Sequence, residues 1–173
     1  MNLNLSTKRL KLRPFTMNDA SHVYELANDP AITETTLNIP YPYTLEDAEE
    51  WIIMPDDSRK NGIYPFAIVL KEENQLIGAM TIGVNQRHKR GELAYWVGQN
   101  YWGQGYATEA AERIVQFGIQ ELLLHKMWAQ ALTFNPASAK VMQKIGMKKE
   151  GTLIDHFYKN GEFLSVDVYG MSV

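Results

Sequence analysis

One ten-residue segment sets the architecture of this chain: Tyr101-Trp102-Gly103-Gln104-Gly105-Tyr106-Ala107-Thr108-Glu109-Ala110. It follows a strand-like run from Glu92 to Val97 and leads directly into alanine-rich helical sequence. Two glycines one residue apart allow a tight turn and let a ligand come close to the backbone. Because the first turn of a helix has unpaired N–H groups and positive potential, such a loop favours a phosphate or pyrophosphate. The glycine spacing alone equally fits an ordinary strand-to-helix turn, so the rest of the chain has to decide.

The sequence before this segment predicts two helices followed by strands. Alternation from Arg9 to Phe15 is typical of a half-buried strand, and apolar residues at helical spacing predict a first helix over Asp19 to Asn28. Residues Ala31 to Tyr43 are expected to be irregular, with a length that suggests function. Thr44, with an acidic residue three positions later, resembles a capping arrangement that opens a second helix to about Ser58. The strands predicted next are residues 64–71, 75–84 and 92–97.

The sequence after the segment predicts a helix, a strand, a short helix and a final hairpin. A helix from Thr108 to Leu123 precedes a strand from Lys126 to Thr133, which we expect to run parallel to residues 92–97. Asn135-Pro136 at the start and Gly146 at the end bound a short helix. Residues 147–171 predict two strands joined at Asn160-Gly161. We therefore expect one α+β domain over residues 1–173, with a mixed, mostly antiparallel sheet of about seven strands flanked by helices.

Composition narrows the class of protein. The 173 residues are 45% hydrophobic and carry a net charge of −3, which suits a globular domain and argues against bulk binding to nucleic acid. Cysteine is absent, which excludes a disulfide, a thiolate metal site and a cysteine nucleophile. The four histidines lack metal-ligand spacing, so no metal is expected. With neither a signal peptide nor a membrane-spanning run in the sequence, we expect a soluble cytoplasmic protein without membrane association.

The order of these motifs resembles the Gcn5-related N-acetyltransferase (GNAT) superfamily, in particular its RimJ/RimL-type ribosomal-protein alanine acetyltransferases. Three stretches carry the resemblance: Thr7 to Pro14, Tyr101 to Ala110, and Asn135 to Met147. The resemblance implies the GNAT fold, acetyl-CoA as co-substrate, and a splayed parallel strand pair that holds it. One departure is visible, because Trp102 stands where the superfamily usually has Gln or Arg. This is tolerable if backbone N–H groups hold the pyrophosphate, and the RimJ-like subgroup shares the feature.

The resemblance also implies roles for residues on both sides of the cleft. Backbone N–H groups of the loop, with the Thr108 hydroxyl, would bind the CoA pyrophosphate; the residues are Gln104, Gly105, Tyr106, Ala107 and Thr108. The backbone of Tyr95 and Val97 would pair with the pantetheine arm, while their side chains pack in the sheet. Asn135 would contact the pantetheine or the acetyl end in addition to capping its helix. Ser138 aligns with a position that can protonate the leaving thiolate, although a solvated side chain fits that helix position equally.

Glu92 is the candidate general base, because an acceptor amine must lose its proton to attack a thioester. The alternative is an exposed strand residue paired with Lys89 or Arg90. Direct transfer onto a primary amine follows, with backbone N–H groups near Val97 polarising the carbonyl. Tyr41, Tyr43 and Trp51 are candidates for the acceptor entrance, although aromatic residues at this spacing are more often core.

The acceptor stays open at this stage. The first choice is the α-amine of a protein N-terminus of the ribosomal-protein type. A small amine (polyamine, amino acid or antibiotic) is the second choice, and a non-catalytic acyl-CoA-binding module is a third. By analogy with the family, the final strands are also candidates for pairing across a homodimer.

Overall fold

The computed structural model describes residues 3–53 and 61–173. The short 3-10 helices η1 (Met17–Asp19) and η3 (Gln99–Tyr101) accompany the main elements. The helices are α1 (Ala20–Ala27), α2 (Pro30–Thr35), α3 (Leu45–Ile53), α5 (Tyr106–Gln120) and α6 (Pro136–Lys144). The strands are β1 (Leu5–Ser6), β2 (Leu10–Arg13), β3 (Ile63–Leu70), β4 (Leu76–Asn85), β5 (Arg90–Val97), β6 (Lys126–Leu132), β7 (Lys148–Lys159) and β8 (Glu162–Ser172).

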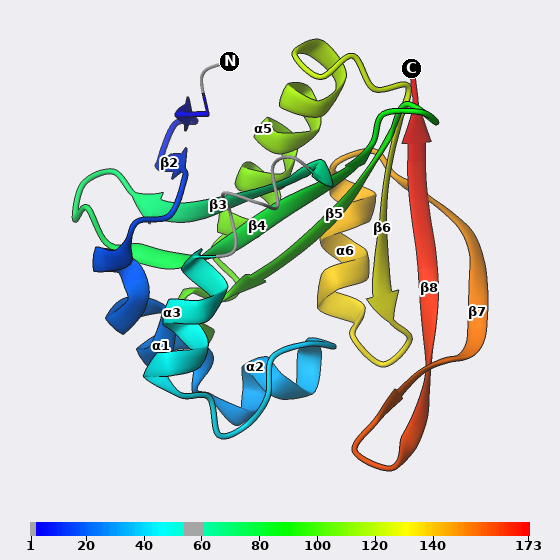
Figure 1. Cartoon of the computed structure of the whole chain (residues 1–173). Helices are drawn as coiled ribbons and strands as arrows, with labels where there is room; N and C mark the ends of the chain where they lie inside the picture. Colours follow the sequence, from blue (N-terminus) through cyan, green and yellow to red (C-terminus); the bar gives the residue numbers. More distant parts are fainter. Residues whose placement is uncertain (1–2, 54–60) are drawn as a thin grey trace.

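Among the described residues, the strands form one eight-stranded sheet in the order β1-β2-β3-β4-β5-β6-β8-β7 (Figure 1). The prediction of about seven strands is one short, because the two-residue β1 adds to the edge beside β2. Neighbouring strands are antiparallel except β5 and β6, which are parallel as predicted. The parallel pair arises because α5 carries the chain back to the start of the sheet before β6 begins.

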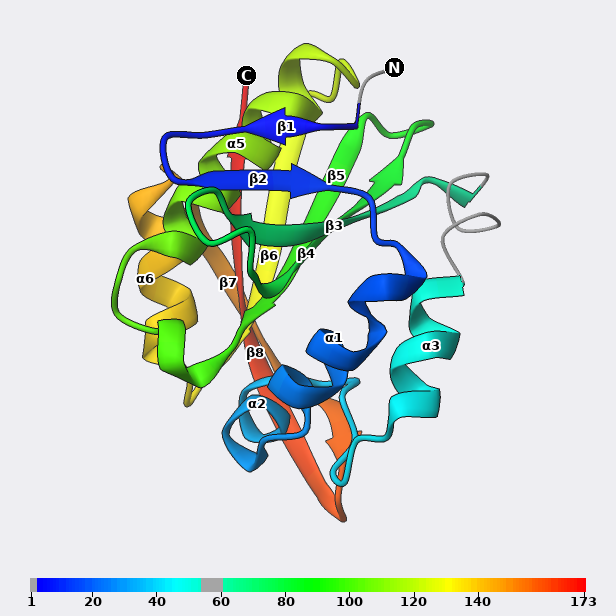
Figure 2. The same ribbon diagram turned by 90° about the vertical axis from the view of Figure 1, so that its left-hand side faces the viewer.

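The helices cover both faces of the strongly twisted sheet. Figure 2 shows α5 and α6 on one face and α1 and α3 on the other. Strand β3 shows why both faces need cover: Phe66 and Ile68 join the core under α5, whereas Ala67 and Val69 join the core under α1 and α3. A strand that is buried on both faces is apolar throughout rather than alternating, as the last five residues of β3 are.

The segment predicted to be irregular, Ala31 to Tyr43, is only partly so, which corrects that prediction. Residues Pro30–Thr35 form α2, whose N-cap Asp29 accepts a hydrogen bond from the Ala31 N–H at 2.9 Å. The sequence Asp29-Pro30 is a helix stop for α1 and, equally, a cap with proline at the first position of a new helix. Ile32 is buried, so tertiary packing completes this short helix.

Other local predictions are confirmed by the structure. Asp47 accepts hydrogen bonds from the Thr44 N–H and hydroxyl at 2.8 and 2.7 Å, and α3 follows from Leu45 to Ile53. The predicted end of this helix near Ser58 lies outside the described residues. At the final hairpin, Asn160 and Gly161 both have positive φ, at 52° and 86°, as a two-residue hairpin turn requires.

The parallel pair β5–β6 stops pairing halfway along β5. Its register runs from Arg90 opposite Lys126 to Leu93 opposite Ala129. Beyond that point β5 stays paired with β4 as far as Val97, and β6 stays paired with β8 as far as Leu132. The two strands therefore diverge, and this divergence positions the candidate site.

Candidate functional site: a cleft between β5 and β6

The loop that opens α5 presents unpaired backbone N–H groups. Gly103 and Gly105 have φ of 71° and 82°, the left-handed region that favours glycine. Gly105 is the N-cap and offers no side-chain hydrogen bond, while its carbonyl accepts from the Glu109 N–H at 3.0 Å. The N–H groups of Gly105 and of the first helical turn, Tyr106 to Thr108, precede the first intrahelical bond. This arrangement suits an anion, because the helix dipole adds positive potential at the same place.

The Trp102 side chain connects this loop to the end of β5 by a hydrogen bond. Its indole Nε1–H donates to the Val97 carbonyl oxygen at 2.6 Å. The side chain that replaces the superfamily's usual Gln or Arg is therefore used within the protein. It holds the loop against the strand from which the cleft opens.

The backbone edge of β5 turns toward the cleft at Tyr95 and Val97. The Gly98 N–H donates to the Ile77 carbonyl of β4 at 2.8 Å. In an antiparallel ladder, alternate residues direct their N–H and C=O groups to the same neighbour. The backbone N–H and C=O groups of Tyr95 and Val97 therefore point away from β4, toward the side where β6 has diverged. The Val97 carbonyl accepts from Trp102 there, and the remaining groups have the geometry expected of a strand edge that pairs with an extended ligand.

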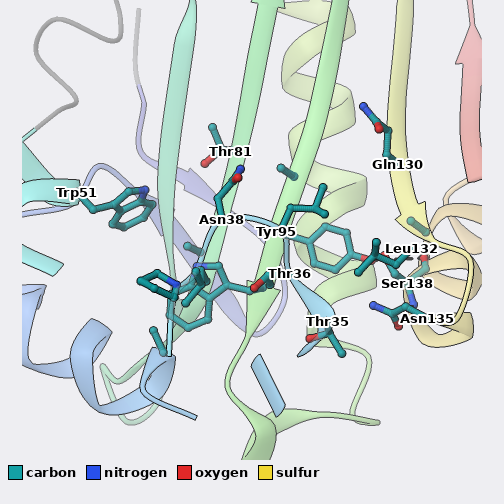
Figure 3. Close-up of a pocket in the computed structure, with 18 of the residues that line it drawn as sticks. Thr35, Thr36, Asn38, Trp51, Thr81, Tyr95, Gln130, Leu132, Asn135 and Ser138 are labelled. Carbon is teal, nitrogen blue, oxygen red and sulfur yellow. Dashed lines mark hydrogen bonds between the residues drawn. The ribbon is translucent and has the colours of Figure 1, made fainter. Parts of the chain in front are cut away.

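Across the cleft, the first turn of α6 contributes Asn135 and Ser138. The Asn135 carboxamide oxygen accepts from the Ser138 N–H at 3.3 Å, so Asn135 is the predicted N-cap. The Ser138 hydroxyl lies 2.9 Å from the Tyr95 hydroxyl. Figure 3 shows the Tyr95 ring extending from β5 toward Ser138 and Asn135. Burial raises the pKa of Tyr95, and the hydrogen bond with Ser138 partly offsets that rise, so the phenol is protonated at neutral pH.

Glu92 lies on the same strand, one residue before the parallel pairing ends. Its carboxylate accepts a hydrogen bond from the Gln130 side-chain amide of β6 at 3.0 Å. Burial raises its pKa, and the hydrogen bond from Gln130 and the charge of Arg90 oppose that rise only in part. The side chain is thus partly buried and held by β6, unlike the exposed residue of the alternative interpretation. A carboxylate with a raised pKa is a better proton acceptor near neutral pH.

A cavity of about 890 Å³ opens beside these groups and reaches from Glu92 to Ser138. In Figure 3, Trp51 lies on the left of the cavity and Ser138 and Asn135 on the right, with Asn38 and Tyr95 between them. The cavity is lined by three carboxylates, Asp47, Glu50 and Glu92, and by the aromatic side chains of Tyr43, Trp51, Tyr95, Trp96 and Phe157. Among the described residues that line it, none is Lys or Arg. Of the three aromatic residues predicted at the entrance, Tyr41 lines a separate cavity beside α2 instead.

The structure brings four of the ten predicted site residues to one cavity, although their chemical roles stay predictions. Glu92, Tyr95, Asn135 and Ser138 line the cavity, and Val97 lies at the end of the same strand. Gln104 to Thr108 lie outside this cavity, in the glycine loop and the first turn of α5. Two features of the site were not predicted. The sequence indicates a role for the Tyr95 backbone but none for its hydroxyl, and it does not identify Gln130. The alternation of Lys126 to Leu132 places Gln130 on one face of a strand, but no sequence signal indicates which carboxylate it meets.

Residues 3–53 and 61–173 contain neither a metal-ligand cluster nor a membrane-spanning helix. No group of three or more His, Cys, Asp or Glu side chains there is arranged to hold a metal ion. No described helix combines the length and the apolar character that crossing a membrane requires.

The chain is similar to known proteins in sequence and in structure. The sequence model of the family "Acetyltransferase (GNAT) domain" matches residues 9–148. The uncharacterized N-acetyltransferase p20 of Bacillus licheniformis is 32% identical over 98% of this chain and 94% of its own length. The spermidine N(1)-acetyltransferase of Escherichia coli K12 is 26% identical over 91% of this chain and 83% of its own length. A solved structure of RimL, a ribosomal L7/L12 alpha-N-protein acetyltransferase in complex with coenzyme A, superposes with a TM-score of 0.90. It is 15% identical and covers 99% of this chain and 98% of its own.

The family match spans most of the chain and includes the glycine loop, both strands of the cleft and the start of α6. The chain belongs to the GNAT acetyltransferase family and is an acetyl-CoA-dependent N-acetyltransferase.

Proposed function

We propose that this enzyme transfers the acetyl group of acetyl-CoA directly to a protein N-terminal α-amine, with Glu92 as general base. The observation that carries the proposal is the position of the Glu92 carboxylate, which lines the cavity beside the point where β5 and β6 diverge. Its raised pKa suits a base that takes a proton from an amine with a pKa near 8. No covalent enzyme intermediate is required.

In this proposal, donor and acceptor meet from opposite faces of the sheet. The pyrophosphate binds the N–H groups of the loop from Gln104 to Thr108, and the pantetheine arm pairs with Tyr95 and Val97. Asn135 caps α6 through its oxygen, which leaves its amide nitrogen for the donor. Glu92 lies between Gly91 and Leu93 on β5, where successive side chains point to opposite faces of the sheet. Because Leu93 belongs to the core under α5, the Glu92 side chain lies on the other face, the face of Trp96, under α1 and α3. The acceptor therefore enters from the α1–α3 side.

The reaction needs two proton transfers, one from the acceptor amine and one to the departing CoA thiolate. The amine nitrogen attacks the thioester carbonyl carbon and forms the C–N bond, and Glu92 accepts the proton that the amine loses. Backbone N–H groups near Val97 polarise the carbonyl oxygen. The C–S bond breaks, and the departing thiolate takes a proton from the Ser138 hydroxyl, which is hydrogen-bonded to that of Tyr95. Because a thiol has a pKa of about 8.5, this second transfer contributes little to the rate. Solvent then returns a proton to the hydroxyl pair and removes the proton held by Glu92.

The charge of the cavity supports a cationic acceptor. Asp47, Glu50 and Glu92 line it without a lysine or arginine among the described lining residues. Carboxylates in a cleft raise the local concentration of a positively charged substrate. A protein N-terminus carries this charge, and the RimL structure is described as an alpha-N-protein acetyltransferase.

A small polyamine is the second candidate for the same reason. Tyr43, Trp51 and Trp96 provide aromatic faces beside the carboxylates, a combination that binds ammonium groups. A relative covering most of the chain is named spermidine N(1)-acetyltransferase. The two candidates differ in size, because a polyamine is enclosed by the cavity whereas a peptide extends out of it.

Incubation with acetyl-CoA and parallel panels of peptides and polyamines tests the proposal. We expect free thiol to be released with peptides, and mass spectrometry to locate the acetyl group on the N-terminal nitrogen. Acetylation of spermidine with inert peptides would favour the second candidate. Release of no thiol with any amine, together with intact CoA binding, would count against both acceptors.

We also propose self-association through the terminal hairpin. Strand β7 is the edge of the sheet, and Ile154, Tyr158 and Phe163 of the hairpin are 77%, 67% and 65% exposed. An exposed edge strand with apolar side chains favours pairing with another strand. Analytical ultracentrifugation should detect a dimer that Ile154→Lys weakens; a strictly monomeric wild-type protein at micromolar concentration would contradict it.

A further inference from the structure

Arg9, in the turn between β1 and β2, reaches across to the donor loop. Its Nε donates to a Glu109 carboxylate oxygen at 2.6 Å, and its Nη1 donates to the Gln104 carbonyl oxygen at 2.9 Å. The guanidinium carbon lies 4.4 Å from the centre of the Tyr106 ring. One side chain, about a hundred residues earlier in the sequence, therefore contacts both the loop, at Gln104, and the first turn of α5, at Tyr106 and Glu109.

The partner carboxylate is itself firmly placed. One Glu109 oxygen accepts from the Thr7 hydroxyl at 2.6 Å and from the Arg9 N–H at 2.8 Å. Burial alone would raise the pKa of Glu109, but the hydrogen bonds from Thr7 and Arg9 outweigh it and lower the pKa, so the residue is ionised. A carboxylate in the first turn of α5 is also stabilised by the helix dipole. The guanidinium is thus fixed by an anchored anion on one side.

One nitrogen of the guanidinium stays directed at the loop. Arg9 Nη2 lies 3.3 Å from the position that a Cβ atom on Gly105 would occupy. The Arg9 side chain is 41% exposed, so solvent or a ligand reaches it. Gly105 is the N-cap of α5, where the unpaired N–H groups of the first turn begin. A fixed positive charge and a set of backbone donors therefore share one small region.

The loop has no other side-chain cation of its own. Residues 101–108 contain neither Lys nor Arg, and the Trp102 indole N–H is occupied by the Val97 carbonyl. We propose that Arg9 is the residue that binds a phosphate group of CoA in this enzyme, through Nη2, while Nε and Nη1 position the loop. Arginine suits the task because its planar fork contacts two partners at fixed angles, which lysine cannot do. This inference rests on the proposed donor seat at the loop.

Titration calorimetry with CoA tests the inference on the wild-type protein, Arg9→Gln and Arg9→Lys. We expect Arg9→Gln to raise the Kd for CoA by roughly 10- to 100-fold, the usual effect of losing a hydrogen bond to a charged group. Arg9→Lys should fall between the two, because it keeps the charge and loses the fork. The salt dependence of log Kd should be shallower in Arg9→Gln, since one phosphate contact is lost.

Thr7→Val is the matched control, because it loosens Glu109 without removing the cation. Its Kd for CoA should stay within about threefold of the wild-type value, which is well below the change expected for Arg9→Gln. Arg113→Gln, which breaks an ion pair between α5 and its C-cap residue Glu121, controls for net charge. Thermal unfolding shows whether each variant folds. If Arg9→Gln does not fold, Arg9→Lys is compared with the wild-type protein instead.

The ligands separate the remaining interpretations. Pantetheine, which lacks phosphate, should stabilise wild-type and Arg9→Gln proteins equally against thermal unfolding. Dephospho-CoA, which lacks the 3′-phosphate, shows which phosphate Arg9 contacts. If Arg9→Gln raises the Kd for dephospho-CoA as much as that for CoA, the contact is with the pyrophosphate. If it leaves the Kd for dephospho-CoA unchanged, the contact is with the 3′-phosphate. Equal CoA affinity in the wild-type and Arg9→Gln proteins would overturn the inference about Arg9. So would a loss of CoA affinity in Thr7→Val as large as that in Arg9→Gln. Neither result would bear on the proposed donor seat. Failure of the wild-type protein to bind CoA would instead overturn the proposed donor seat.

Discussion

Replacement of Glu92 by glutamine removes the proposed base and changes little else. The two side chains have the same shape, and a glutamine oxygen can still accept the hydrogen bond that Gln130 donates at 3.0 Å. Burial raises the pKa of Glu92, which means that the fold favours its neutral form over the charged one. A neutral glutamine therefore costs the folded state nothing, and the melting temperature should stay the same or rise.

The expected loss of activity follows from the size of general base catalysis. Such a group contributes about 100- to 10,000-fold to the rate, or about 3–5 kcal/mol of transition-state stabilisation. Because the donor loop and the β5 edge are unchanged, the loss should fall on kcat while CoA affinity stays constant. A loss in affinity instead would indicate damage to the cleft.

The pH profile gives a second, independent readout. Glu92 acts as a base only when ionised, so the rate should fall as the pH drops through its pKa. Since this pKa is raised above the ordinary 4.5, the acidic limb of the wild-type profile should lie above pH 4.5. A second limb, at about pH 8, reports the acceptor amine and should persist in Glu92→Gln, whereas the first limb should disappear.

Initial rates of thiol release with saturating acetyl-CoA, measured across pH for wild-type and Glu92→Gln enzymes, provide the assay. Glu50→Gln is the matched control, since Glu50 lines the same cavity but is exposed. It should retain kcat within a few-fold. The reasoning about Glu92 fails if Glu92→Gln loses less than about tenfold in kcat, well below the range for general base catalysis, or keeps its acidic limb.

Three further changes test other parts of the structure. Asp19→Asn should lower the free energy of unfolding by about 2 kcal/mol, because it breaks the paired 2.8 Å hydrogen bonds from Arg13 to a buried carboxylate. Burial raises the pKa of Asp19, but the bonds from Arg13 and the backbone lower it overall, so this stability is present above pH 3.8 and is lost at lower pH. Urea denaturation at neutral and acidic pH should therefore show the variant and wild type converging in acid. Gly105→Ala should cost about 1 kcal/mol of stability at its φ of 82° and weaken CoA binding, measured by denaturation and calorimetry; unchanged values in both would contradict it. Ser138→Ala should reduce kcat by less than about tenfold, because the thiolate is a weak base and the Tyr95 hydroxyl remains; a hundredfold loss in thiol-release assays would make Ser138 a required acid.

The elements predicted correctly are those encoded within a few residues. Asn160-Gly161 predicted the hairpin because two positive φ angles are needed at adjacent positions. Asn135-Pro136 and Gly146 predicted α6 because capping and termination use local backbone groups. The parallel β5–β6 pair followed from a helix between two strands.

The errors arose where one local signal serves two purposes. Asp29-Pro30 ends one helix and begins the next, so α2 was read as irregular chain. The count of strands was low because the two-residue β1 has too little sequence to show alternation. Neither error affected the predicted site, which lies at the centre of the sheet.

The sequence by itself determined the glycine loop, the strand before it, the capped α6 and the family to which this order of elements belongs. Only the tertiary structure decided which side chains meet: Glu92 with Gln130, Tyr95 with Ser138, and Arg9 with Glu109. The physical reason is range. Caps and turns depend on backbone groups a few residues apart, whereas these three pairs join residues 38, 43 and 100 positions apart, whose meeting depends on sheet order, register and helix packing.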